Sequence, residues 1–64
     1  MEFKGTIGAT DGSTLVIGGF TVTIDSSTDL ESFDGQPPAV GQYVEVHGWL
    51  QTNGSVFAYK IELK

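Results

Sequence analysis

Short runs in which apolar and polar residues alternate recur along this chain, and this pattern constrains the fold more than any other feature. In residues 20–25, FTVTID, the apolar residues Phe20, Val22 and Ile24 alternate with threonine and aspartate. A period of two places successive side chains on opposite faces of a β-strand, one toward a core and one toward water. Similar runs predict strands over residues 2–9, 14–17, 20–25, 43–51 and 56–63. We therefore expect an all-β fold.

Three dipeptides between these runs are typical of tight turns. Asp11-Gly12 and Gly18-Gly19 separate the first three runs, and Asn53-Gly54 separates the last two. Because glycine adopts positive φ without strain, Gly18-Gly19 predicts a two-residue hairpin. The order is then a three-strand meander followed, after a longer connection, by a C-terminal hairpin.

Residues 26–42 interrupt the alternation. Thr28 and Glu31 have the spacing of a capping box, which predicts a short helical turn or loop at about 28–34. Leu30 and Phe33 would then share a face and plug one end of the sheet. Three strands, a plug and a hairpin are the layout of a small five-stranded OB-like barrel. We predict one such domain over residues 1–64.

The composition excludes several classes of function. The chain contains eight acidic residues, three lysines and no arginine, so its net charge is −5. Proteins that bind nucleic acid normally show a basic surface, so we expect no nucleic-acid partner. No apolar run approaches the roughly 18 residues of a membrane span, so we expect no membrane insertion. The chain has no cysteine, so neither a disulfide nor a thiolate ligand is available.

Nearly the whole chain resembles a bacterial family of domains of unknown function. The similarity lies in GTIGATDGSTLVIGGFTVTID, Thr28, VGQYVEVHGWL and NGSVFAYKIEL. Members look like OB-type barrels, often in exported or envelope-associated proteins, so the resemblance implies export to the periplasm, cell envelope or cell exterior. The matching positions are turn and core positions, and they imply no catalytic residue. Similar sequences usually carry polar or small residues where this chain has His47 and Trp49.

Two registers are open for the last hairpin. A two-residue turn at Asn53-Gly54 pairs Gly48 with Tyr59 and turns Tyr59 inward. The resemblance implies instead that Ala58 and Ile61 both face inward, which requires a β-bulge near Tyr59.

The choice of register decides how many aromatic residues are exposed. In the bulged register Phe57 and Tyr59 turn outward, near Tyr43 and Trp49. A one-residue slip moves a whole set of side chains across the sheet. In either register one side of residues 43–50 is expected in the core, namely Val44, Val46, Gly48 and Leu50.

Five residues on these two strands are the candidate contact residues: Tyr43, His47, Trp49, Phe57 and Tyr59. Tryptophan and tyrosine combine apolar area with a polar group and are enriched in contact surfaces. They could contact neighbouring domains of the parent chain or a protein partner. The alternative is cross-strand packing on an exposed sheet face.

Catalysis and metal binding have weaker support. His47 could carry a proton, but a general base needs a nucleophile, and the chain has no cysteine and no serine in a nucleophile motif. The alternative is an exposed strand residue beside Lys60. Four acids within residues 25–34 (Asp25, Asp29, Glu31 and Asp34) resemble oxygen ligands for Ca²⁺, but they lack the EF-hand spacing. We expect no enzyme activity, no cofactor and no metal.

The expected function is that of a non-catalytic structural or protein-interaction module, excised from a larger bacterial protein. The alternative is an OB-type module that binds an oligosaccharide or peptide through the aromatic surface of the last two strands. Exposure of Trp49 separates these readings, because a buried Trp49 favours a purely structural role.

Overall fold

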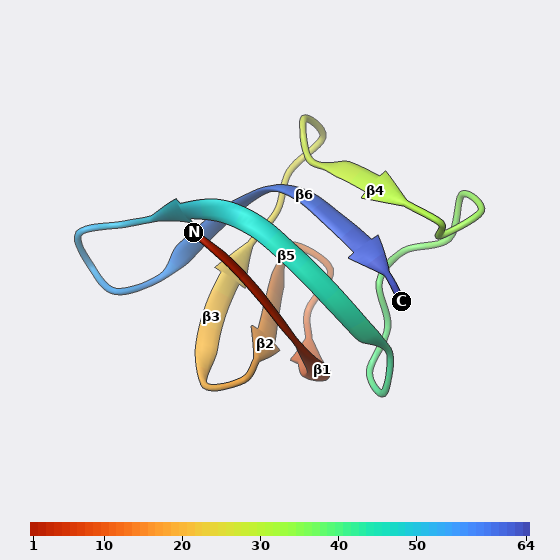
Figure 1. The fold of residues 1–64 in the computed structure, drawn as a ribbon, viewed down its shortest axis with the longest axis horizontal. Coiled ribbons are helices and arrows are strands. Elements are labelled where there is room, and N and C mark those ends of the chain that lie inside the picture. The colour runs from red at the N-terminus through yellow and green to blue at the C-terminus, as the bar shows by residue number, and fades with distance from the viewer.

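The computed structural model covers residues 1–64, which form six β-strands and no helix (Figure 1). The strands are β1 (Glu2–Thr10), β2 (Thr14–Ile17), β3 (Phe20–Thr23), β4 (Asp29–Glu31), β5 (Tyr43–Leu50) and β6 (Val56–Leu63). The predicted all-β fold is confirmed. The chain contains no helix of the length and apolarity that crossing a membrane requires.

The strands form one sheet in the order β3-β2-β1-β5-β6-β4. β3 also pairs with β6 in parallel, so β1, β2, β3, β5 and β6 close into a five-stranded barrel. β4 pairs in parallel with the C-terminal half of β6, at residues 60–62 (Figure 1). A meander of three strands closed by a hairpin is consistent with a small OB-like barrel. The predicted barrel is present, with one additional strand.

The barrel interior holds ten buried apolar side chains, most of them supplied by the predicted alternation. They are Ile7, Leu15, Ile17, Val22, Phe33, Val44, Val46, Val56, Ala58 and Ile61. The prediction that Leu50 belongs to the core is wrong, because its side chain is 61% exposed. The last β1–β5 pair is Glu2 with His47, so no β1 residue lies beside the end of β5.

The loop before β6 differs from the predicted two-residue turn. The Gln51 N–H donates to the Ser55 carbonyl at 2.7 Å, and Gly54 has a φ of 89°. The loop therefore has three residues, 52–54, with glycine in the left-handed position that such loops need. By contrast, Gly18 and Gly19 both have positive φ and form the predicted two-residue hairpin.

A β-bulge at Tyr59 restores the register that the longer loop shifts. His47 pairs with Lys60, whereas Gly48 pairs with Ala58, so Tyr59 is the additional residue. Ala58 and Ile61 are both fully buried. The bulged register is therefore confirmed and the regular ladder is excluded.

The segment after β3 corrects a second prediction, because Asp29–Glu31 forms strand β4 and not a helical turn. The Thr28 hydroxyl accepts from the Asp25 N–H at 3.1 Å and donates to the Ala58 carbonyl at 2.8 Å. This hydroxyl therefore holds the segment against β6 and does not cap a helix. Phe33 is buried as the predicted plug, whereas Leu30 remains 37% exposed.

Candidate functional site

The structure divides the five candidate contact residues into one group and two separate positions. His47, Trp49 and Tyr59 lie together on the outer face of β5 and β6. Tyr43 is also exposed, but it lies opposite Thr6 at the other end of β5. Phe57 pairs with Trp49 but is half-buried, because it also lies beside Thr23 of β3. Tyr43 therefore does not belong to the group around Trp49.

The three grouped residues form what we call the aromatic surface (His47, Trp49 and Tyr59). The rings of Trp49 and Tyr59 have centroids 5.1 Å apart at an interplanar angle of 34°. The Tyr59 ring also lies 6.2 Å from the His47 imidazole. These separations are typical of favourable aromatic pairs. Trp49 is 60% exposed and Tyr59 is 43% exposed.

The bulge and the alternation of β5 together assemble this surface. His47 and Trp49 are two residues apart on β5 and therefore point to the same face. Tyr59 is the residue that the bulge adds to β6, so its side chain reaches the space beside Trp49. A regular ladder would have placed Tyr59 opposite Gly48.

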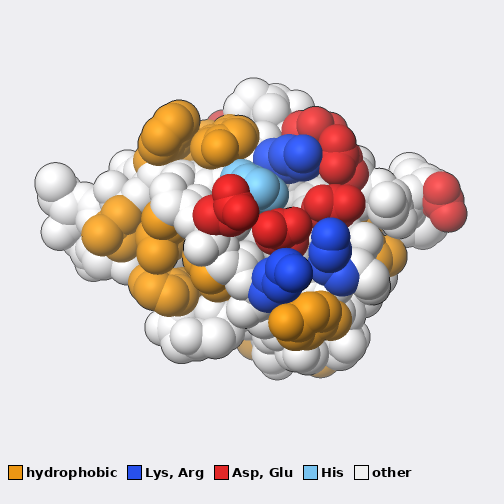
Figure 2. Space-filling view, in the orientation of Figure 1, with side chains coloured by type: hydrophobic (Ala, Val, Ile, Leu, Met, Phe, Trp, Pro, Cys, Tyr) orange, Lys and Arg blue, Asp and Glu red, His pale blue; other side chains and the backbone are white.

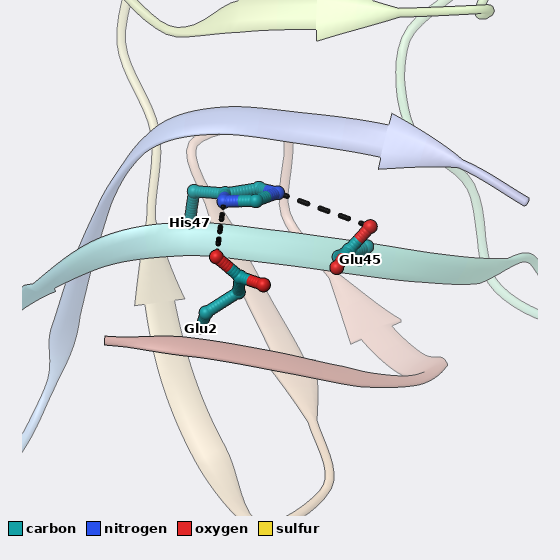
Figure 3. A group of neighbouring side chains, drawn as sticks. All are labelled: Glu2, Glu45 and His47. Atoms are coloured by element: carbon teal, nitrogen blue, oxygen red, sulfur yellow. Dashed lines mark ion pairs between the residues drawn. The ribbon is translucent and has the colours of Figure 1, made fainter.

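A polar cluster (Glu2, Glu45 and His47) adjoins the aromatic surface (Figure 3). The Nδ1 atom of His47 lies 3.1 Å from Oε2 of Glu2, and Nε2 lies 3.9 Å from Oε1 of Glu45. The side chains of His47 and Glu45 are each only 17% exposed, whereas that of Glu2 is 62% exposed. Sequence reasoning missed Glu2, because nothing in a single sequence shows that Glu2 of β1 pairs with His47 of β5.

Ion pairs surround the polar cluster. The Lys64 ammonium lies 3.6 Å from a carboxylate oxygen of both Glu45 and Glu62. The Lys60 ammonium lies 3.4 Å from Glu31, whose hydrogen bond and charge raise the pKa of Lys60 above its usual value. Figure 2 shows these charged side chains gathered around the single histidine, with hydrophobic side chains beside it. Ion pairs between exposed side chains typically contribute little stability.

The acids of residues 25–34 do not form a second polar cluster. Asp25 accepts hydrogen bonds from the Ser27 hydroxyl and N–H within its own turn. Glu31 is paired with Lys60. Only Glu2, Glu45 and His47 form a group of three metal-ligating side chains whose ligand atoms lie within 4.8 Å of one another.

The surface of the barrel has two shallow depressions. One depression of about 240 Å³ lies between the ends of β1 and β2, and one of about 310 Å³ lies beside Phe33 and Pro37. Neither is lined by any of the five candidate contact residues. The aromatic surface is thus an outer sheet face without a pocket.

Comparison with known proteins assigns the family. The sequence profile of a domain of unknown function, DUF5666, matches residues 4–62. The chain belongs to the DUF5666 family. Neither a curated protein nor a solved structure matches it. The match covers nearly the whole barrel of this DUF5666 domain, but Glu2 of the polar cluster, at the start of β1, lies outside the matched residues.

The positions that carry the resemblance have structural roles in this DUF5666 domain. Val44, Val46, Ala58 and Ile61 are all fully buried. Gly48 lies so close to β6 that a Cβ there would be 2.3 Å from the Phe57 carbonyl oxygen. Membership of the family therefore accounts for the barrel and leaves the outward residues of β5 to be explained separately.

Proposed function

We propose that this DUF5666 domain is a non-catalytic module of a larger, exported bacterial protein, and that its aromatic surface contacts a neighbouring domain or a protein partner. One observation carries the proposal. Trp49 and Tyr59 pack together with their rings 5.1 Å apart, yet they remain 60% and 43% exposed.

Exposed aromatic area of this kind is suited to contact with another protein. Tryptophan and tyrosine dominate the binding energy of many interfaces, where truncation of such a residue to alanine costs on the order of 2–4 kcal/mol. The rings are held by packing on two paired strands, so little conformational freedom is lost on binding. The absence of a pocket at this face fits a broad protein contact better than a small ligand.

The charge of the domain favours a particular kind of partner. The chain carries −5 overall, and Glu2 and Glu45 flank the aromatic surface. Complementary charge speeds association and disfavours wrong partners. We therefore expect basic side chains on the partner and no binding of nucleic acid. The export of the parent protein is inferred from the resemblance of the chain to exported and envelope-associated proteins.

Solvent footprinting of the domain alone and within its parent protein tests the proposal. We expect oxidation of Trp49 and Tyr59 by hydroxyl radicals to fall at least threefold when the rest of the parent protein or its partner is present. Tyr43 is the matched control, because its exposure of 50% lies between those of Tyr59 and Trp49 but it is at the other end of β5. Its oxidation should not change.

Two results would contradict the proposal. Equal oxidation of Trp49 and Tyr43 in all forms of the protein would remove the aromatic surface as a contact. Turnover of a substrate by the isolated domain, lost in His47→Ala, would show that the module is catalytic.

A further inference from the structure

The polar cluster is built on the pairing of β1 with β5, which has no register shift. Glu45 and His47 are two residues apart on β5, so both side chains leave the outer face. Glu2 is the β1 residue directly opposite His47 in the antiparallel register. Three side chains from two adjacent strands therefore offer one ligand atom each within 4.8 Å of one another, without any contribution from a loop (Figure 3).

The polar cluster contains more hydrogen-bond acceptors than donors. Each ionised carboxylate only accepts, and a neutral imidazole has one N–H and one bare nitrogen. Both nitrogens of His47 face a carboxylate, at 3.1 Å for Glu2 and 3.9 Å for Glu45. While His47 is neutral, one of these two contacts therefore places a lone pair against a carboxylate oxygen, and either a second ring proton or a bound cation relieves it.

The lysines of this face do not supply that cation fully. Lys64 approaches Glu45 but shares its ammonium with Glu62. Lys60, which pairs with His47 in the register, has its ammonium beside Glu31. No lysine ammonium lies within 4.0 Å of Glu2.

We propose that Glu2, Glu45 and His47 bind a divalent metal ion of the Zn²⁺ class. Zinc takes imidazole nitrogen and carboxylate oxygen at about 2.0–2.2 Å, and two such ligands of a tetrahedral ion are about 3.3 Å apart. The Nδ1 atom of His47 and Oε2 of Glu2 are 3.1 Å apart, close to that separation. The Glu45 carboxylate lies beside Nε2 of the same ring, so it reaches an ion on Nδ1 by a rotation of its side chain, which replaces its pairing with Lys64.

The ligand set favours zinc over harder cations. Ca²⁺ takes six to eight oxygen ligands and Mg²⁺ a nearly ideal octahedron of oxygens, whereas imidazole is typical of zinc, copper and nickel. Three protein ligands on an outer face leave the fourth position of a tetrahedral ion to water or to a group on a partner. The site thus adds a second binding element beside the aromatic surface.

Titration of the domain with Zn²⁺ tests the site. We expect one ion to bind in isothermal titration calorimetry at pH 7.5, with a matching shift of the His47 ring ¹⁵N resonances. The affinity should fall at least tenfold in His47→Ala and in Glu2→Gln. Asp29→Asn is the control, because it removes one negative charge from an exposed carboxylate of β4 that forms no ion pair and lies outside the cluster, and its affinity should change by less than twofold.

The other outcomes overturn the proposal. Zn²⁺ binding that survives in His47→Ala would be unspecific binding to acids, and binding that Glu2→Gln leaves unchanged would be attachment to a single surface histidine. If the His47 nitrogens respond to pH but not to Zn²⁺, the cluster is bridged by a proton alone. Circular dichroism of each variant verifies that the barrel is intact.

Discussion

At the scale of single residues, three glycines of the barrel wall differ in what a side chain would meet. A Cβ on Gly48 would lie 2.3 Å from the Phe57 carbonyl oxygen, which belongs to the bulged strand and has little freedom to move. A Cβ on Gly5 would lie 2.8 Å from Cγ2 of Ile17, the end of a side chain. A Cβ on Gly8 would lie 3.7 Å from its nearest neighbour, which is ordinary contact.

These distances predict a graded series of alanine variants. Gly48→Ala should lower the free energy of unfolding by about 3 kcal/mol, because overpacking against backbone forces the strands apart. Gly5→Ala should cost about 1 kcal/mol, since Ile17 can adjust. Gly8→Ala should be nearly neutral. Urea denaturation measures all three, and equal stability of Gly48→Ala and Gly8→Ala would show that the bulge is not as close to β5 as described.

An aspartate or asparagine followed two residues later by serine occurs at three turns of the chain. Asp11, Asp25 and Asn53 each accept a hydrogen bond from the N–H of the serine two residues later. Such Asx turns hold a chain reversal with one side chain. This was available from the sequence, because the interaction needs no partner from elsewhere in the fold.

At the scale of elements, the sequence predicts what depends on neighbours along the chain. The hairpin at Gly18-Gly19 and the alternating strands follow from local pattern and are confirmed. The sequence does not decide whether β6 has a bulge at Tyr59. The register depends on which face of the strand packs better against the rest of the barrel. The predicted helical turn is wrong because the Thr28 hydroxyl donates to the Ala58 carbonyl of β6. Spacing along the chain does not reveal this distant partner.

Thr28 should therefore determine whether β4 stays attached to β6. Thr28→Val removes the bonds to Asp25 and Ala58 and leaves a carbonyl at the bulge without its partner. We expect a loss of about 1–2 kcal/mol in unfolding free energy and faster amide exchange across residues 29–31.

Thr21→Val is the matched control for this change. Thr21 is exposed on β3, and its side chain makes no hydrogen bond with the protein. Its replacement should alter stability by less than about 0.5 kcal/mol. Unchanged exchange of residues 29–31 in Thr28→Val would mean that backbone pairing alone holds β4.

At the scale of the whole molecule, closure of the barrel creates the features that sequence reasoning could not find. The barrel closes through the pairing of β3 with β6, and β1 reaches β5 across more than thirty residues of chain. Glu2 meets His47 only because of that pairing. The outward position of Trp49 and its adjacency to His47 were predictable from alternation, whereas the polar cluster depends on a long-range register.

The response of the molecule to acid follows from two turn aspartates. Hydrogen bonds from the Ser13 and Thr14 N–H groups lower the pKa of Asp11, and those from the Ser27 hydroxyl and N–H lower the pKa of Asp25. A carboxyl whose pKa is lower in the folded state stabilises the fold above its unfolded pKa of 3.8. That contribution is lost as the pH falls below 3.8 through the folded values.

Unfolding in urea between pH 7 and pH 2.5 measures this effect. We expect stability to fall below pH 4 and the fall to be smaller in Asp25→Asn, which has no carboxyl to protonate. Asp34→Asn is the control, because the Asp34 carboxylate accepts no hydrogen bond within the protein. The same acid sensitivity in wild type and in Asp25→Asn would assign the loss to other groups.

The position of β4 also bears on how the protein behaves in concentrated solution. β4 is the one strand of the sheet that has a neighbour on a single side. It is three residues long, carries Asp29 and Glu31, and is followed by Ser32 with a φ of 67°. Fibrils grow by adding strands to long, flat and uncharged edges. The edge at β4 is therefore a poor template for such growth between copies of the protein.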